Sequence, residues 1–112
     1  MTAIKAKSIK AGAVVLGVVS LLIAAPTFAA DGEGTYNKVC KTCHGSGVMG
    51  APKLGDAADW SARAGQGVAT LEENAIKGFK GSKGFMPPKG GRSSLSDDEV
   101  KAAVAYILAN SK

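Results

Sequence analysis

The chain has 112 residues and a formal net charge of +5, enough for one small domain. Three lysines lie in the first ten residues, and without residues 1–29 the chain has 83 residues and a net charge of +2. This modest charge gives no case for nucleic-acid binding. A domain of this size has a thin core and often needs a cofactor or another staple.

Residues 1–29 have the layout of a secretory signal peptide. A basic start is followed by the apolar stretch Ala11–Ala25 and by a run of small residues. Cleavage after Ala29 places small residues at both recognition positions, −3 and −1. The alternative is an uncleaved membrane anchor, because the apolar stretch nearly spans a bilayer if it continues to Ala30. We therefore expect an exported, periplasmic domain over residues 30–112.

A helix is expected over residues 31–41, leading into Cys40-Lys41-Thr42-Cys43-His44, the attachment motif for c-type haem. On a helix, positions i, i+3 and i+4 lie on one face. Cys40 and Cys43 can therefore form thioethers with the two haem vinyl groups, and His44 can reach the iron from the same side. The glycine at position 32 would let another helix approach closely.

Three other interpretations of the C-x-x-C pair fit less well. A structural zinc site needs about four N or S ligands, and the chain has three in total. A thioredoxin-like redox pair needs a βαβ context, which the surrounding sequence does not have. A disulfide across so small a loop would constrain little of the chain. One covalent haem c is therefore the predicted cofactor.

Two short helices are expected next. Asp56 is a suitable N-cap for a helix that contains Trp60 and Arg63 and ends near residues 65–67. Residues 68–77 have helical periodicity, although a capping box beginning at Thr70 would give a later start. Residues 78–94 are rich in glycine and proline, and no regular structure is expected there.

The clearest helix begins at Leu95 and runs to the end of the chain. Ser96 with Glu99 forms a capping box, and Leu95 with Val100 forms a hydrophobic staple. No β-strand is expected. The predicted fold class is therefore all-α, with about four helices and long loops around one haem. The buried face of this last helix should comprise Val100, Val104, Ile107 and Leu108.

Methionine is a recurring second ligand of c-type haem iron, and it raises the reduction potential. Met49 follows His44 too closely for its chain to pass round the edge of the macrocycle. Met86, in Gly84-Phe85-Met86-Pro87-Pro88, is the better candidate, since the prolines stiffen its loop. The alternative is that Met86 only fills a gap in the core. With both axial positions filled, the iron can exchange electrons but cannot readily bind a substrate.

From about Tyr36 to Ile107 the chain resembles the class I c-type cytochromes, and most closely the bacterial cytochrome c5 group. The resemblance rests on Trp60, Arg63 and the segments YNKVCKTCH, GVMGAPKLGD, AIKGFKG, MPPKGG and LSDDEVKAAVAYI. It implies the small class I cytochrome c fold and haem attachment outside the bacterial cytoplasm. The chain departs from some members in lacking a second cysteine pair, and residues 80–83 look like a slight lengthening.

The resemblance also implies roles for single residues. The Pro52 carbonyl would accept the Nδ1 proton of His44, and Leu54 would pack on the haem. Trp60 and Arg63 would contact a haem propionate, with ordinary packing or a surface charge as the alternative. Tyr36 and Tyr106 would form the aromatic pair at which the first and last helices cross.

The sequence is interpreted as a periplasmic monohaem carrier of single electrons in a respiratory chain, and not as an enzyme. One alternative is a cytochrome subunit held permanently in a membrane or enzyme complex. Another is a gas-binding or peroxidatic haem protein in which Met86 is not a ligand. Four basic residues that flank Met86 would surround the haem edge and steer acidic redox partners, unless they only solvate a loop. They are Lys80, Lys83, Lys89 and Arg92.

Overall fold

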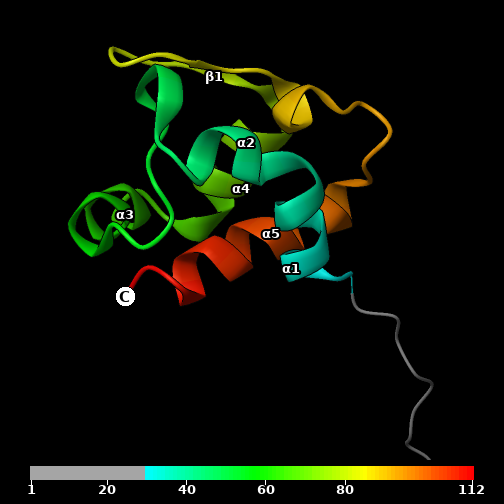
Figure 1. Cartoon of the computed structure of the whole chain (residues 1–112), viewed down its shortest axis with the longest axis horizontal. Helices are drawn as coiled ribbons and strands as arrows, with labels where there is room; N and C mark the ends of the chain where they lie inside the picture. Colours follow the sequence, from blue (N-terminus) through cyan, green and yellow to red (C-terminus); the bar gives the residue numbers. More distant parts are fainter. Residues whose placement is uncertain (1–29) are drawn as a thin grey trace, which may run out of the picture.

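The computed structural model describes residues 30–112, so the expected signal peptide and its cleavage site lie outside the described residues. No helix within residues 30–112 is long and apolar enough to cross a membrane. The described chain is mostly helical (Figure 1). In chain order its elements are α1 (Gly32–Thr35), η2 (Tyr36–Cys40), α2 (Lys41–His44), η3 (Val48–Gly50), α3 (Ala57–Ala64), α4 (Val68–Lys77), β1 (Phe79–Lys80), β2 (Phe85–Met86), η4 (Pro88–Gly91) and α5 (Asp97–Ala109).

The first helix is continuous from α1 through η2 to α2, because the residues at both junctions keep right-handed helical angles. Asp31 caps its start by accepting a hydrogen bond from Gly34 N–H at 2.9 Å. The helix continues to His44, three residues beyond the expected end. Its middle section, η2, is a π-helix in which the Lys41 N–H donates to the Tyr36 carbonyl. Counted this way there are four main helices, which confirms the all-α prediction.

The first and last helices cross at Gly32, as predicted. A Cβ atom on Gly32 would overlap the backbone carbonyl oxygen of Ala102 in α5, so only glycine permits this approach. One turn further along, the rings of Tyr36 and Tyr106 lie with their centroids 5.3 Å apart and tilted by 43°. The predicted aromatic pair is therefore confirmed.

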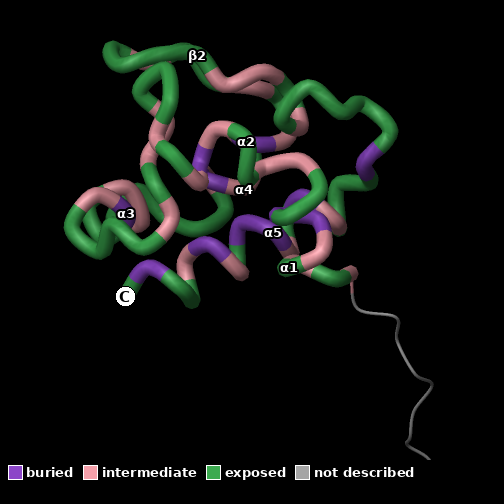
Figure 2. Tube along the Cα trace, viewed as in Figure 1, coloured by how far each residue is buried: buried purple, intermediate pink, exposed green. Residues whose placement is uncertain are grey.

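The start of α5 is capped as the sequence predicts. Ser96 Oγ accepts from the Glu99 N–H at 3.1 Å, and Glu99 Oε1 accepts from the Ser96 N–H at 2.9 Å. Val100, Val104 and Ile107 are buried, with Ala103 beside them, while Leu108 is half-buried. Figure 2 shows this buried face of α5 turned toward the first helix and α4.

The core consists of two apolar clusters, and Leu108 packs against both. The larger cluster joins α4 to α5, and its buried members are Leu71, Ala75, Leu95, Val100 and Val104. The smaller cluster lies where the first helix, α3 and α5 meet, and its buried members are Tyr36, Trp60 and Ile107. The two clusters bring the N-terminal and C-terminal thirds of the domain together.

The two short middle helices follow the prediction. Asp56 Oδ1 caps α3 through the Asp59 N–H at 3.1 Å. Helix α4 begins at Val68, directly after Gly67 with a φ of 101°, so the alternative capping box at Thr70 is not used. Gly78, with a φ of 90°, ends α4 as expected of a C-terminal glycine.

The expectation of no regular structure over residues 78–94 is wrong. Strands β1 and β2 form an antiparallel hairpin in which Phe79 pairs with Met86 and Lys80 with Phe85. The Gly81 N–H donates to the Gly84 carbonyl at 2.8 Å and closes the turn. The residues that look like a lengthening are therefore Lys80, at the end of β1, and residues 81–83 of the hairpin turn. Strands of two residues are too short to produce an alternating pattern in the sequence.

Candidate functional site

The motif cysteines and histidine lie at the end of the first helix. Cys40 is the last residue of η2, and Cys43 and His44 close α2. Both thiols are free and half-buried. Cys40 packs against the smaller core cluster, and this burial raises the pKa of its thiol. No three His, Cys, Asp or Glu side chains of residues 30–112 are arranged to hold an ion directly, so a zinc site does not fit.

His44 is held in one orientation by the loop that follows it. Its Nδ1 lies 2.7 Å from the Pro52 carbonyl oxygen. A carbonyl only accepts hydrogen bonds, so Nδ1 carries the proton and Nε2 keeps its lone pair. The Leu54 N–H also donates to the His44 carbonyl at 2.7 Å. Residues 52–54 thus fix both the ring and the backbone of His44, and they leave Nε2 as the nitrogen that can bind iron.

Trp60 also holds residues 52–54, the loop that orients His44. Its indole N–H donates to the Lys53 carbonyl at 2.9 Å, and its ring lies 5.9 Å from the His44 ring, centroid to centroid. The indole has a single N–H, so the expected propionate contact would require it to leave Lys53. Nothing in the sequence around Trp60 signals this bond, because Lys53 contributes only its backbone.

Arg63, the other residue expected near a propionate, pairs with Asp59 one turn earlier in α3. Its Nε lies 2.8 Å from Asp59 Oδ1, and both side chains are about one quarter exposed. The terminal guanidinium nitrogens of Arg63 remain as further donors. Arg63 therefore has a local partner that the sequence analysis did not consider, and it keeps donors for an anion.

The two methionines of the described chain have different environments. Met86 is half-buried at the end of β2 and packs against the larger core cluster. Met49 lies in η3 with a φ of 55° and is 82% exposed. The Pro88 ring packs over Gly78, where a Cβ atom would meet Pro88 Cδ at 3.0 Å. The loop after Met86 is thus pressed against the end of α4.

The loop after His44 and the hairpin before Met86 lie against each other. A Cβ atom on Gly50 would overlap the Lys83 carbonyl oxygen, and one on Gly84 would overlap the Met49 carbonyl oxygen. These two glycines bring the histidine and methionine segments together. In the sequence, the only signal of Gly50 and Gly84 is that they flank Met49 and Phe85.

The basic residues near Met86 do not form one uniform group. Lys80, Lys83 and Arg92 are exposed, whereas the Lys89 side chain is only 20% exposed. Lys89 Nζ donates to the Leu95 carbonyl at 2.7 Å and lies 3.0 Å from Asp97 Oδ1. Lys89 therefore differs from the other three cations of the predicted docking edge, because it is already paired with Asp97.

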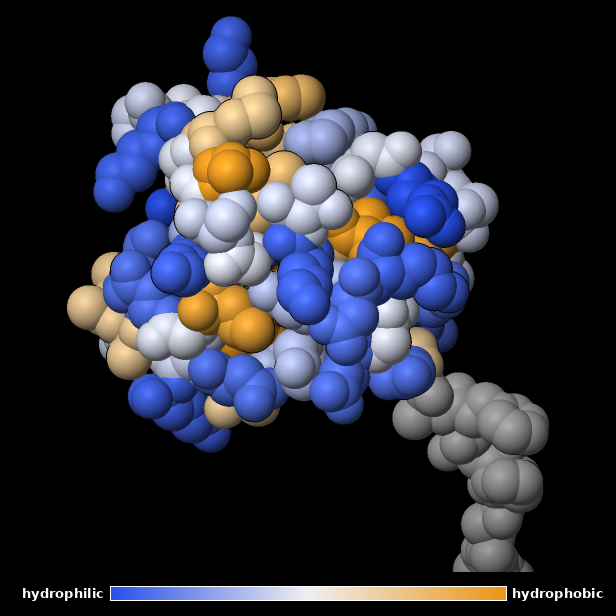
Figure 3. All heavy atoms as spheres, in the orientation of Figure 1, coloured by the Kyte–Doolittle hydropathy of each residue, from blue (hydrophilic) through white to orange (hydrophobic). Residues whose placement is uncertain are grey.

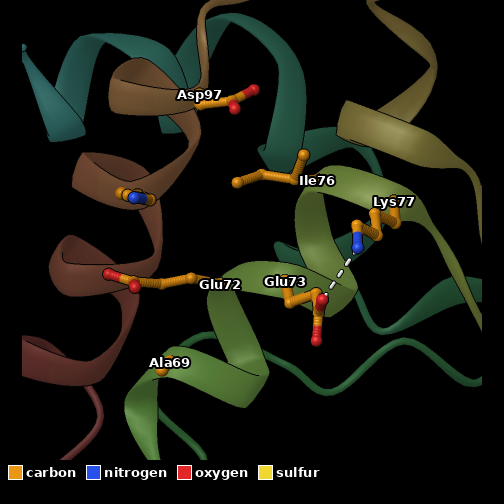
Figure 4. A pocket seen from close by; sticks show the side chains of 7 residues that line it. Ala69, Glu72, Glu73, Ile76, Lys77 and Asp97 are labelled. Atoms are coloured by element: carbon orange, nitrogen blue, oxygen red, sulfur yellow. Dashed lines mark hydrogen bonds and ion pairs between the residues drawn. The ribbon is translucent and has the colours of Figure 1, made fainter.

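Two cavities lie away from these residues. One, of about 400 Å³, lies between α4 and α5 and contains the exposed Glu73–Lys77 ion pair (Figure 4). The other, of about 570 Å³, lies between α3 and the C-terminal end of the chain. Neither is lined by the motif cysteines, by His44 or by Met86. They are therefore separate from the candidate site.

The fold and the site together define a c-type haem protein. The two free thiols lie three positions apart at the end of one helix, and the next residue is a histidine whose Nδ1 proton is already engaged. These donors fit covalent haem, which needs two thiols for the vinyl groups and one imidazole nitrogen for the iron.

Comparisons with known proteins agree with this class. Residues 27–107 match the family model described as cytochrome c oxidase, cbb3-type, subunit III. The chain is 50% identical over 96 residues to cytochrome c-555 of Chlorobaculum tepidum, covering 83% of this chain and 89% of that protein. It is 41% identical over 81 residues to cytochrome c5 of Azotobacter vinelandii, covering 70% and 93%.

Solved structures extend the comparison to the fold. A chain in the crystal structure of an electron transfer complex of nitrite reductase with cytochrome c is 40% identical, with a TM-score of 0.64 over 72% of this chain and 94% of that one. A mono-haem ferrocytochrome c from Shewanella putrefaciens is 38% identical, with a TM-score of 0.59 over 73% and 95%. The chain therefore belongs to the cytochrome c family. It is a class I monohaem cytochrome with one covalently attached haem c, and it carries electrons.

Proposed function

We propose that Cys40 and Cys43 form the two thioethers and that His44 and Met86 are the axial ligands of the iron. The observation that carries this proposal is the 2.7 Å hydrogen bond from His44 Nδ1 to the Pro52 carbonyl. It fixes the tautomer and the ring orientation in which Nε2 is free to bind a metal.

The bound haem supplies an iron that accepts and releases one electron. The chain holds two ligands that do not change with the redox state, which keeps reorganisation small. Met86, packed on the larger core cluster and followed by two prolines, keeps the second position from opening to water or oxygen. An iron with both axial positions occupied has no free coordination position for a substrate. We therefore propose an electron carrier without enzymatic activity of its own.

Four further residues have supporting roles in this proposal. Pro52 orients His44, and Leu54 contributes an apolar surface for the macrocycle while its N–H holds the His44 backbone. Trp60 keeps Lys53, and with it the neighbouring Pro52 carbonyl, in place. Arg63 offers its remaining guanidinium donors to a propionate.

We propose that redox partners dock on the hairpin surface, which is formed by β1, β2, their turn and η3. Figure 3 shows hydrophobic side chains at this end of the molecule with hydrophilic ones around them. Its exposed apolar members are Val48, Met49, Phe79 and Phe85, its exposed cations are Lys80 and Lys83, and the exposed Arg92 follows η4 further along the chain. Such a surface suits a protein with an acidic rim around an apolar centre. That a similar chain occurs in an electron transfer complex with nitrite reductase supports a protein partner.

Export to the periplasm and cleavage after Ala29 complete the proposal. Class I cytochromes c are typically exported, and residues 1–29 have the layout of a signal peptide. Intact-mass measurement of the purified protein tests cleavage directly. A mass for residues 30–112 plus one haem is expected, whereas a mass that includes residues 1–29 would favour a subunit anchored in a membrane complex.

The axial ligation is tested by Met86→Ala, with Met49→Ala as the matched control. Met86→Ala should keep the covalent haem, lose the weak far-red charge-transfer band of ferric Met–haem, and lower the reduction potential. The expected shift is on the order of 100 mV, because axial ligands move haem potentials over about 0.8 V. Redox titration with optical spectra measures all three properties.

Met49→Ala should leave the band and the potential close to those of the parent, since its side chain is 82% exposed. An unchanged potential and band in Met86→Ala would show that the ligand assignment is wrong. A parent protein without the band, and with an iron that binds added ligands freely, would instead favour the gas-binding or peroxidatic class.

A further inference from the structure

Lys89 adopts a backbone conformation that lysine rarely takes. Its φ is 54° and its ψ 33°, in the left-handed region, while Gly90 and Gly91 directly after it also have positive φ. A non-glycine residue at positive φ costs free energy and persists only where its surroundings impose it. The side chain therefore has contacts that compensate for the backbone strain.

Those contacts join the methionine loop to the start of α5. Lys89 Nζ donates to the Leu95 carbonyl at 2.7 Å and lies 3.0 Å from Asp97 Oδ1. Leu95 is a buried member of the larger core cluster, against which Met86 also packs. The Lys89 ammonium group thus connects the loop to the start of α5. Leu95, one of its two partners there, belongs to the cluster against which Met86 packs.

This pairing differs from an ordinary surface ion pair. The Lys89 side chain is 20% exposed and its partner Asp97 is 61% exposed, whereas Lys77 and Glu73, at 2.8 Å, are 71% and 60% exposed, so the two pairs differ on the lysine side. Exposed pairs contribute little, but a charged donor to a backbone carbonyl in a shielded position contributes more. The buried hydrocarbon stem of Lys89 adds packing.

The rest of the loop is held by apolar contacts. Pro88 packs over Gly78, and at Gly90 a Cβ atom would meet Val39 Cγ1 at 3.0 Å. These contacts press the loop against α4 and the first helix, but they supply no directional bond. Lys89 adds a directional, charge-assisted attachment to the third neighbour, α5.

We propose that Lys89 is a positioning residue that holds the Met86 loop closed by fastening it to the start of α5. The inference rests on the proposed ligation by Met86. Loss of the Lys89 attachment leaves the cofactor in place but lets the loop open more often. An added ligand then competes with Met86 more successfully for the ferric iron.

The test measures how tightly imidazole binds to the ferric holoprotein, because imidazole must displace Met86. Lys89→Gln and Lys89→Gly are compared with the parent, following loss of the far-red band as imidazole is added. Both variants should bind imidazole about tenfold more tightly, which corresponds to ~1.4 kcal/mol. Glycine adopts positive φ without strain but adds backbone freedom, whereas glutamine keeps a side chain at this position, so a gain in imidazole affinity shared by both variants reflects loss of the ammonium group.

Matched controls isolate the attachment. Lys77→Gln removes a lysine from an exposed pair elsewhere and should leave imidazole affinity unchanged. Asp97→Asn should raise imidazole affinity by less than Lys89→Gln does, since the bond from Lys89 Nζ to the Leu95 carbonyl remains. Asp98→Asn, in the same helical turn, should have no effect. Midpoint potentials are measured in parallel, and Lys89→Gln should show a lower value, since weaker methionine ligation stabilises the ferric state.

Imidazole affinities of Lys89→Gln and Lys89→Gly equal to that of the parent would overturn the inference. So would a fall in thermal stability without any change in affinity, which would leave Lys89 a purely structural residue. Failure of the proposed function looks different. In that case the parent itself lacks the far-red band, and Met86→Ala changes neither its spectrum nor its potential.

Discussion

A single hydrogen bond decides the chemistry of His44. The ring donates through Nδ1 to the Pro52 carbonyl, and the adjacent Lys53 carbonyl accepts from Trp60. The consecutive carbonyls of Pro52 and Lys53 therefore accept hydrogen bonds from His44 and Trp60. The rings of these two residues lie 5.9 Å apart, centroid to centroid. Loss of either bond would loosen residues 52–54, so Trp60 acts on His44 through the backbone of this loop.

Tyr36 makes the stability of the domain depend on alkaline pH. Its side chain is 2% exposed, and its pKa is raised by burial first, and then by Tyr106 and Cys40. In the unfolded chain it ionises near its ordinary value of 10.0. The folded state therefore holds this proton to higher pH than the unfolded state, and its stabilising contribution is lost as pH rises from 10.0 through the raised pKa.

Tyr36→Phe should therefore reduce the loss of stability above about pH 10, because phenylalanine has no proton to release. Denaturant unfolding of the parent and the variant, at neutral pH and at two alkaline pH values, measures the two slopes. The control is the neutral sample, in which any constant difference reflects packing alone. Equal alkaline slopes in the two proteins would contradict the prediction.

Among the elements, the continuous helix 32–44 joins the crossing with α5 to the haem-attachment motif. Its start crosses α5 at Gly32, its middle places Tyr36 and Cys40 in the smaller cluster, and its end carries Cys43 and His44. The π-helical section lies between the crossing and the motif. Such sections often occur at functional sites. A change at the crossing would therefore be transmitted to the cofactor site.

Gly32→Ala should destabilise the domain by about 1–3 kcal/mol, because the new methyl group overlaps a backbone carbonyl that cannot move alone. Thermal or denaturant unfolding measures the loss. Gly34→Ala is a comparison in the same helix, since its methyl group would meet the Asp31 side chain and not backbone, so that its cost is limited to the Asp31 cap, typically ~1 kcal/mol. A Gly32→Ala protein as stable as the Gly34→Ala protein would show that the crossing is not tight.

On the scale of the whole molecule, most of the exposed large apolar side chains gather at one end, together with the exposed Lys80 and Lys83. Val48, Met49, Phe79 and Phe85 lie on the hairpin and on η3, which touch through Gly50 and Gly84. The capped start of α5 lies beside the methionine loop, to which Lys89 joins it, and the charged cavity of Figure 4 lies between α4 and α5.

The double variant Lys80→Gln/Lys83→Gln should slow oxidation by hexacyanoferrate(III), an anion, by about two- to fivefold at low ionic strength. The same variant should react faster with the cation tris(phenanthroline)cobalt(III). Both effects should vanish near ~1 M salt, at which the Debye length falls to about 3 Å. Stopped-flow absorbance measures the rates.

Lys101→Gln/Lys112→Gln removes the same net charge from exposed positions at the C-terminal helix and chain end, and it should change both rates much less. If the two double variants behave alike, only net charge matters and the hairpin surface has no special role. Opposite responses to the two oxidants are therefore the decisive observation.

The sequence by itself determined features that depend on residues within one or two turns of each other. The C-x-x-C-H motif, the Ser96–Glu99 capping box and the ends of α3 and α4 all follow from local hydrogen bonding and helical spacing. The family resemblance added the Tyr36–Tyr106 pair, which the structure confirms. Even the glycine at position 32 was correctly interpreted as a crossing point.

Only the tertiary structure decided which distant groups meet. The hairpin depends on pairing across a turn, and the acceptors of Lys89 and Trp60 are backbone carbonyls that no residue type identifies. Such contacts arise when the two core clusters close, and the sequence does not encode them as a local pattern. Lys89 therefore looked like one of four similar cations in the sequence, and in the folded protein it is the one whose charge is used inside the domain.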